Sequence, residues 1–333
     1  FSGYASFDFL FDGDYHRQKV DVMRNNVKTT LLEFRKEDDV KGKILITLKD
    51  PSKQLQHSGI TITMVGQIKI IPSGKTYQFM EQTIESSRGG IIFEEKTLIP
   101  FAFQRPFQRY ETYIGDAVKL QYFLRVQINT KYPPRPYAEQ ELLVRMPSTS
   151  MPLSSSINME MHVDRMIQCT LHLRKTNYST VGDVVLGFVL LRNIRLVLSG
   201  MEIHIVRKEH WSNNSEKNVS IIKRVQIMDG FAIKGESIPI KIPLKDTMLT
   251  ASYTSVAGVF SVDYFISLVV IDSEGRRFFF DTPIQVYSLE NPLSTKVGMN
   301  PPTMVYNLDR LTQVVQPDVP RFVSTLKDRK SVV

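Results

Sequence analysis

The segment IMDGFAIKGESIPIKIPL, residues 227–244, decides the fold that we expect for this chain. In its second part, four apolar residues alternate with polar residues and prolines, which predicts a strand buried on one face. The apolar positions are Ile238, Ile240, Ile242 and Leu244. Pro239 and Pro243 share the outward parity and cannot donate ladder hydrogen bonds, so we expect an edge strand.

The first part of the same segment contains the end of an incoming strand and a turn. Val225 and Ile227 take the core parity of that strand, and Asp229-Gly230 is a turn signal typical of a hairpin. Met228 is therefore predicted to point away from the core. An apolar side chain at this place either fills the packing around the turn or anchors another protein, and the pattern leaves both interpretations open.

Strict alternation of apolar and polar residues recurs from the start of the chain, whereas helical periodicity is nearly absent before the tail. Turn clusters such as Asp50-Pro51-Ser52 separate the alternating runs. This pattern predicts an all-β sandwich protein. The clearest runs have these apolar positions: Ile44, Ile46 and Leu48; Ile60, Ile62 and Met64; Leu120, Tyr122, Leu124, Val126 and Ile128.

The second half of the sequence repeats the first. SGITI at residues 58–62 and SGMEI at residues 199–203 are offset by 141 positions. VKLQYFL at residues 118–124 and FSVDYFI at residues 260–266 are offset by 142. A weaker match relates the starts of two apolar runs, at Val40 and Val181. Matches in the same order at one spacing indicate a duplicated unit of about 140 residues.

The repeat and the linker composition predict the domain organisation. PSTSMPLSSSI, residues 147–157, is rich in serine and proline and predicts a linker. We expect one sandwich over residues 1–146 and a second over residues 158–288. The remaining residues, 289–333, form a proline-containing tail with one short helical phase at Leu308, Leu311 and Val315, and we expect partial disorder there.

Composition excludes several classes of protein. No apolar run approaches the length of a membrane span, which predicts a soluble protein. The start FSGYASF does not resemble a targeting segment. The net charge of +8 is scattered, not gathered into a stripe, which disfavours nucleic acid. A solvated surface is the favoured interpretation, with an anionic membrane or acidic partner as the alternative.

The sequence contains no convincing catalytic or metal-binding cluster. Cys169 is the only cysteine, which excludes an internal disulfide and favours a reducing compartment. His172 is its nearest potential co-ligand, but an odd separation on a strand places the two on opposite faces. Phosphate loops, nucleophile elbows and paired carboxylates do not stand out. We therefore predict a protein that is not an enzyme and that needs no cofactor or metal.

Five stretches of the sequence carry a resemblance to a known protein family. They are HSGITITMVGQI at residues 57–68, RYETYIGDAVKLQYFLRV at 109–126, IMDGFAIKGESIPIKI at 227–242, FSVDYFISLVVID at 260–272 and RRFF at 276–279. Together and in this order they resemble the arrestin-like subunit of retromer, the vacuolar protein sorting 26 family. The resemblance covers nearly the whole chain from Phe1 to about Tyr287.

The resemblance implies an arrestin fold of two β-sandwich domains and a scaffold without catalysis. It also implies that the C-terminal domain binds the end of the α-solenoid subunit, vacuolar protein sorting 35. The turn in that contact corresponds here to Ile227, Met228, Asp229 and Gly230. The implied location is cytoplasmic and peripheral on endosomal membranes, where any membrane contact is indirect or weak.

The same resemblance implies a role in cargo selection with a phox-homology sorting nexin. A cargo tail with an aromatic-x-aliphatic motif would lie along the seam between the two proteins. The corresponding pocket positions are Met161 and Phe279, and Met161 is bulkier than the β-branched residue expected there. An arrestin-like adaptor of another trafficking complex, of the retriever or α-arrestin type, is the alternative. The loop at residues 245–258 and the linker depart from the family pattern.

Overall fold

The computed structural model describes most of the chain between Ala5 and Leu289. It leaves short gaps at residues 25–26, 51–53, 134, 149, 164–165, 212–214, 246 and 248, and it adds one short strand at Val305–Asn307. In the described residues, strands dominate and the one helical element is a 3-10 turn, η1 (Asp14–His16). Nothing in this part of the molecule forms a helix with the length and apolarity needed to cross a membrane.

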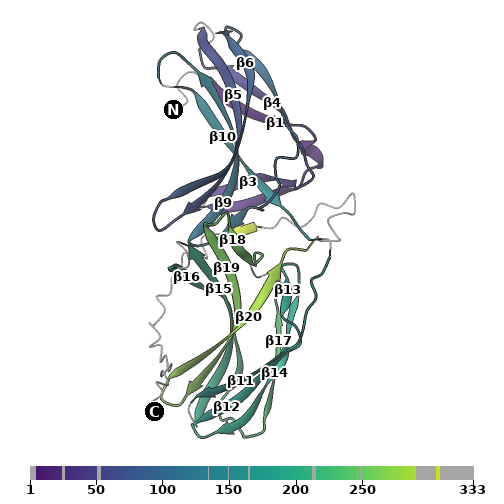
Figure 1. The fold of residues 1–333 in the computed structure, drawn as a ribbon, viewed down its shortest axis with the longest axis vertical. Helices are drawn as coiled ribbons and strands as arrows, with labels where there is room; N and C mark the ends of the chain where they lie inside the picture. The colour runs from purple at the N-terminus through teal and green to yellow at the C-terminus, as the bar shows by residue number, and fades with distance from the viewer. Residues whose placement is uncertain are drawn as a thin grey trace, which may run out of the picture.

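The N-terminal half forms two sheets (Figure 1). The smaller sheet has the order β1-β4-β7, with bounds Ala5–Phe11, Val40–Leu48 and Lys96–Phe103. The larger has the order β21-β2-β3-β10-β9-β5-β6, and β8 pairs with β9. Its bounds are β21 Val305–Asn307, β2 Lys19–Arg24, β3 Val27–Arg35, β10 Tyr137–Arg145, β9 Val118–Asn129, β5 Leu55–Ile70, β6 Thr76–Ile92 and β8 Tyr113–Ile114.

The C-terminal half also forms two sheets. The smaller has the order β11-β12-β14-β17, with bounds Ile157–Val163, Ile167–Leu173, Val184–Ile194 and Ser237–Pro243. The larger has the order β13-β20-β19-β15-β16, and β18 pairs with β19. Its bounds are β13 Asn177–Ser179, β20 Arg277–Tyr287, β19 Phe260–Asp272, β15 Leu198–Trp211, β16 Glu216–Asp229 and β18 Tyr253–Val256.

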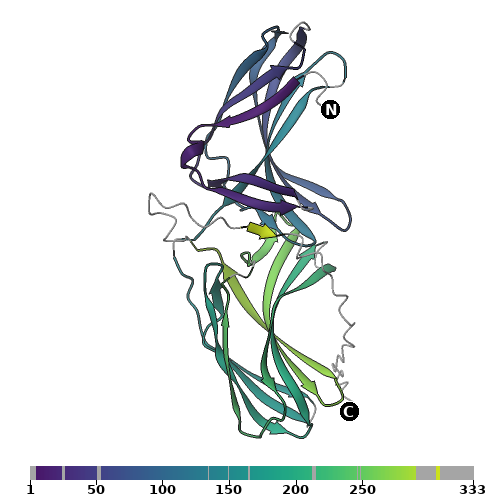
Figure 2. The same cartoon turned by 180° about the vertical axis from the view of Figure 1, so that it is seen from behind.

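The two halves have equivalent strand pairings, as the sequence repeat predicts. SGITI lies on β5 and SGMEI on β15, and these strands pair antiparallel with β9 and β19, which carry the second repeat match. Figures 1 and 2 show the two halves following one another along the long axis of the molecule. The expected all-β architecture of two sandwiches, typical of an arrestin-like fold, is confirmed. The exact domain boundaries stay a prediction.

β17 follows the predicted alternation at every position. Ile238, Ile240 and Ile242 are buried, while Pro239 and Pro243 are exposed. β17 pairs with β14 on one side only, so the prolines lie on an edge strand as predicted.

The predicted hairpin between residues 225 and 244 is wrong. β16 pairs with β15, whereas β17 pairs with β14 in the other sheet of the sandwich. The Asp229-Gly230 turn does reverse the chain, and Gly230 takes a positive φ of 87°. The connection at residues 230–236 then crosses from one sheet to the other. A turn signal is local, and it does not specify the sheet in which the next strand finds its partner.

Candidate functional site

The turn predicted to contact a partner lies at the end of the C-terminal half that points away from the N-terminal half. Ile227 and Met228 are both half-buried and pack against the hydrophobic core, and Asp229 is exposed. A β-bulge explains why two consecutive apolar residues reach the core. Met201 on β15 pairs with Met228, but Glu202 pairs with Gln226, so Ile227 is an extra residue and the alternation shifts by one.

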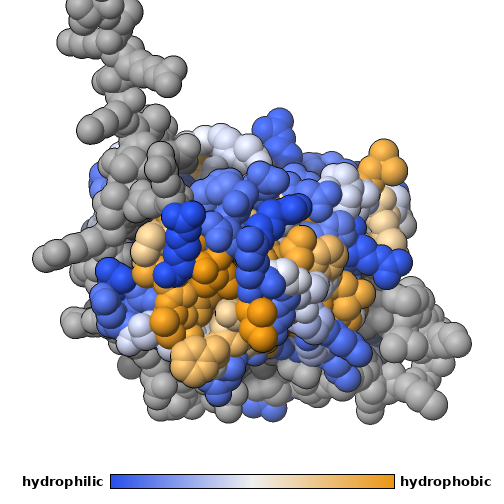
Figure 3. Space-filling view, turned by 90° about the horizontal axis from the view of Figure 1, so that it is seen from below, coloured by the Kyte–Doolittle hydropathy of each residue, from blue (hydrophilic) through white to orange (hydrophobic). Residues whose placement is uncertain are grey.

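Exposed apolar side chains surround this turn and form what we call the tip surface. Phe231 is 83 % exposed and Ile233 is 71 % exposed, both in the connection that follows Gly230. Met166 and Val197 are also exposed and come from two neighbouring loops. Figure 3, which views the molecule from this end, shows apolar side chains gathered between polar ones. An exposed apolar patch of this kind is typical of a protein interaction site.

Backbone hydrogen bonds hold the loops of the tip surface together. The Arg195 N–H donates to the Met166 carbonyl over 2.7 Å, and the Gly230 N–H donates to the Ser199 carbonyl over 3.2 Å. A bond of 2.9 Å from the Ser273 N–H to the Val197 carbonyl ties in the β19–β20 turn. Sequence patterns indicated Ile227 and Met228 but not the four exposed residues. The sequence feature that could have indicated them is the apolar pair Phe231 and Ile233 within a segment of turn-forming residues.

The two residues predicted for the cargo seam have different environments. Met161 lies on β11, is 3 % exposed and belongs to the core. Phe279 lies on β20 and is 45 % exposed. β11 and β20 come together at neighbouring sheet edges, where the Thr282 hydroxyl lies 3.4 Å from the Met159 sulfur. Phe279 is therefore accessible from solvent, whereas Met161 is part of the core.

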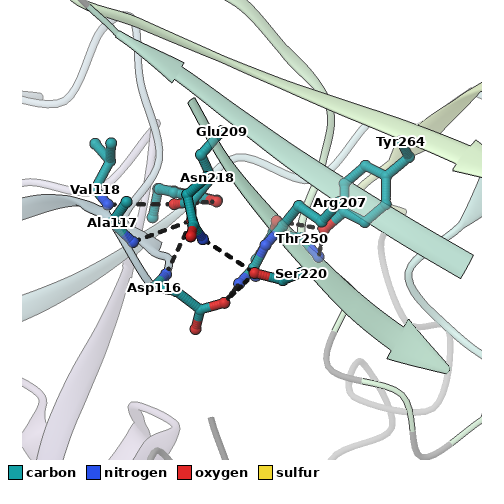
Figure 4. Close-up of polar contacts among 10 residues, drawn as sticks. Asp116, Ala117, Val118, Arg207, Glu209, Asn218, Ser220, Thr250 and Tyr264 are labelled. Atoms are coloured by element: carbon teal, nitrogen blue, oxygen red, sulfur yellow. Dashed lines mark hydrogen bonds and ion pairs between the residues drawn. The ribbon is translucent and has the colours of Figure 1, made fainter. Parts of the chain in front are cut away.

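A polar cluster joins the two halves of the chain, and its centre is the buried carboxylate of Glu209 on β15 (Figure 4). This carboxylate accepts a hydrogen bond of 2.9 Å from the Tyr113 hydroxyl. It also accepts bonds of 3.0–3.2 Å from the backbone N–H groups of Asp116, Ala117 and Val118 in the N-terminal half. Asn218 on β16 donates to the same group over 3.2 Å.

Arg207 forms the second part of this cluster. Its guanidinium is buried and donates to the Asp116 carboxylate over 2.8 Å. The Ser220 hydroxyl donates to the same Asp116 oxygen. Burial alone would lower the pKa of Arg207, but Tyr113, Tyr264 and the nearby carboxylates raise it, so the side chain stays charged. The cluster thus connects the two halves through buried, paired charges.

This cluster was not predicted from the sequence, although β15 contains a pattern that indicates it. Ile203 and Ile205 take the inward parity, and Arg207 and Glu209 continue it. Charged residues at core-facing strand positions need buried partners. Here those partners come from the segment at residues 113–118 of the other half.

Cys169 and His172 point to opposite faces of β12. Cys169 is fully buried, and burial raises the pKa of its thiol to about 11. His172 lies on the other face of β12, stacked on Phe188 with ring centroids 4.8 Å apart. Within the described ranges, no group of three or more His, Cys, Asp or Glu side chains could hold a metal ion.

Comparison with known proteins identifies the family. The family model for vacuolar protein sorting-associated protein 26 matches residues 1–275. The chain belongs to this family. Relatives include vacuolar protein sorting-associated protein 26B of Arabidopsis thaliana, which is 30 % identical over 87 % of this chain and 96 % of its own length. The Homo sapiens protein 26B is 32 % identical over 81 % of this chain and 80 % of its own length.

The Dictyostelium discoideum vacuolar protein sorting-associated protein 26 is a third relative, 29 % identical over 84 % of this chain and 81 % of its own length. The resemblance inferred from the sequence motifs is thereby confirmed. The family match ends at residue 275, so Phe279 and the tail lie beyond it.

Proposed function

We propose that this chain is the arrestin-like subunit of a retromer complex and acts as a non-enzymatic adaptor in vacuolar and endosomal protein sorting. Family membership supports the complex and the process. The tip surface is the observation that supports an adaptor role, because it offers exposed apolar anchors held on a rigid set of loops. The chain would act as a peripheral protein on endosomal membranes, recruited there by its partners.

The proposed partner of the tip surface is the α-solenoid subunit, vacuolar protein sorting 35. The ends of α-solenoids expose grooves between helices, and apolar side chains on a protruding turn fit such grooves. Ile227 and Met228 form the half-buried base of the surface, and Asp229 and Gly230 shape the turn. Each buried apolar anchor in an interface of this kind contributes roughly 2 kcal/mol.

A binding titration against the solenoid subunit tests this proposal. Met228→Asp places a charge that the interface would have to desolvate, so affinity should fall at least about tenfold. Met151→Asp is the matched control, because Met151 is exposed in the segment that precedes β11, away from the tip. Circular dichroism should show both variants folded. A folded wild-type chain that fails to bind at micromolar concentration would remove the main support for a retromer subunit.

The second proposed role is cargo selection together with a phox-homology sorting nexin. The exposed Phe279 on β20, beside the edge of β11, supports a seam for an extended cargo peptide with an aromatic-x-aliphatic motif. Extended peptides commonly add to a sheet edge through backbone hydrogen bonds, while side-chain pockets set selectivity. Loss of peptide binding on Phe279→Ala, with binding to the solenoid subunit unchanged, is the expected result.

A further inference from the structure

A cleft between the two halves of the chain has no part in the proposed function. The ends of β5 and β6 that meet at their shared turn form one wall. The facing ends of β15 and β16, together with the β18–β19 turn, form the other. We call this space the junction cleft. Its volume is about 260 Å³. Small-molecule sites usually begin near 300 Å³, so the junction cleft accommodates about one large side chain.

Aromatic and aliphatic side chains line the junction cleft from both halves. Tyr77 at the start of β6 is 41 % exposed. Trp211 at the end of β15 is 7 % exposed, and its indole N–H donates to the Glu216 carboxylate, which orients the ring. Ile70 and Val259 complete the apolar lining. Aromatic rings pack well edge-to-face or offset against another ring, so these walls favour an aromatic occupant.

The β18–β19 turn that borders the junction cleft has a strained backbone. Ser255 and Ala257 take positive φ values of 50° and 49°, a region that residues with a side chain rarely adopt. The Ser255 N–H donates to the Ser261 hydroxyl over 3.0 Å. The Ala257 N–H donates over 3.1 Å to the hydroxyl of Tyr110 in the other half. Strain of this kind clusters at ligand-binding sites, so the turn indicates a binding site independently of the lining.

The two charged residues of the lining differ in what they already bind. Glu216 accepts the Trp211 indole N–H. Lys75 is exposed, and its ammonium has no partner among the described residues. A carboxylate on the β5–β6 side of the cleft would pair with Lys75, whereas a carboxylate on the β16 side would meet the like charge of Glu216. The lining therefore favours one acidic group, placed beside Lys75.

The exposure of the lining distinguishes a protein partner from a small molecule. Lys75 and Tyr77 are both exposed, so an occupant of the junction cleft keeps part of its surface in solvent. Small-molecule sites bury most of the ligand surface, whereas the rest of a partner protein covers its own anchor side chain.

We propose that the junction cleft binds one aromatic side chain of a protein partner, with an acidic residue adjacent to it that pairs with Lys75. The junction cleft lies where the halves meet, whereas the tip surface lies at the far end of the C-terminal half. This partner is therefore distinct from the one proposed for the tip surface. Because both halves line the cleft, the anchor contacts both of them at once.

The test uses the emission of Trp211, which is the only tryptophan in the chain and lines the cleft. The full chain is titrated at low salt with three tripeptides blocked at both ends: Asp-Phe-Asp, Asn-Phe-Asn and Asp-Ala-Asp. The flanking residues are identical, so the result does not depend on peptide direction. Asp-Phe-Asp should change the emission with a Kd on the order of 1 mM and bind about threefold more tightly than Asn-Phe-Asn. Asp-Ala-Asp should cause no change.

Lys75→Gln should reduce the threefold ratio to about one, because it removes the charge that selects the carboxylate. Lys96→Gln is the matched control, since it removes the same charge from an exposed position on β7 and should keep the ratio. Tyr77→Ala should weaken binding of both phenylalanine peptides about threefold. Tyr132→Ala, at an exposed position between β9 and β10, should leave it unchanged.

Circular dichroism should show all four variants folded. No change in Trp211 emission with Asp-Phe-Asp up to about 10 mM overturns the proposal. An equal response to Asp-Ala-Asp overturns it too, because the cleft then does not recognise the ring. A preference for Asp-Phe-Asp that survives Lys75→Gln overturns the pairing with the acidic residue.

Discussion

The carboxylate of Glu209 on β15 lies 2.9 Å from the hydroxyl of Tyr113 on β8, and this hydrogen bond joins the two halves of the chain. The Tyr113 ring also contacts Phe260 of the C-terminal half, with centroids 5.5 Å apart. Burial raises the pKa of Tyr113 well above its usual range, so the phenol keeps its proton and remains a donor. Buried hydrogen bonds and aromatic packing therefore both join the two halves.

Glu209→Ala should destabilise the protein by about 3 kcal/mol, because it leaves the Tyr113 hydroxyl and three backbone N–H groups without their acceptor. Chemical denaturation measures the change. Glu139→Ala is the control, since Glu139 forms a solvent-accessible ion pair with Arg125 and should cost less than about 1 kcal/mol. Equal effects of the two substitutions would contradict a special role for Glu209.

Gly115→Ala should weaken the contact between the two halves through a steric clash. A Cβ atom at this position would lie 1.9 Å from Glu209 Oε1 and 2.6 Å from the Tyr113 ring, so the carboxylate would have to move. We expect a loss of roughly 2 kcal/mol and faster proteolysis at residues 147–156, the connection between the halves. Gly90→Ala meets no atom closer than 3.8 Å and serves as the control. An unchanged denaturation midpoint for Gly115→Ala would show that the cluster tolerates displacement.

Local alternation predicted the strands and their buried faces well. Ile238, Ile240 and Ile242 are buried as expected because a half-buried strand has a period of two and little else can satisfy that pattern. The same rule failed at Met228, where a bulge shifts the period by one residue. A bulge has no fixed residue type in the sequence, so the parity of Met228 could not be predicted from the alternation alone.

Long-range pairing was harder to predict than local structure. Asp229-Gly230 predicted a turn correctly, but β16 and β17 join different sheets, which no local signal determines. Arg207 and Glu209 show inward parity in the sequence, yet their partners lie about 90 residues earlier in the chain. The helical phase predicted at Leu308, Leu311 and Val315 lies outside the described residues.

The Asp183 carboxylate should make the stability of the folded protein fall in acid. Its carboxylate accepts bonds of 2.6 Å from the Lys175 ammonium and of 3.0 Å from the Ser179 N–H. Burial opposes ionisation, but these bonds lower the pKa of Asp183 below its unfolded value. The ionised group therefore stabilises the fold above about pH 4, and this contribution disappears as pH falls through the folded-state pKa.

Asp183→Asn should accordingly be less stable than the wild type at pH 7, and the difference should shrink as the pH falls from about 4 through the folded-state pKa. Urea midpoints measured across this range test the sign. Asp8→Asn, at an exposed position on β1, controls for general effects of removing a carboxylate. A difference that grows as the solution becomes more acidic would mean that Asp183 is not stabilised by its ionised form.

We expect Phe231 and Ile233 to contribute to partner binding at the tip surface but not to the stability of the free chain. Both are largely exposed in the free chain, so their truncation should leave the denaturation midpoint unchanged. If the solenoid subunit covers the tip surface, Phe231→Ala and Ile233→Ala should each weaken binding about tenfold in a calorimetric titration.

Val219→Ala and Ile221→Ala are matched controls, because these side chains are also exposed but lie further from the turn along β16. Equal losses from all four variants would indicate that the partner covers the whole of β16. A loss confined to Met228→Asp would restrict the contact to the turn itself.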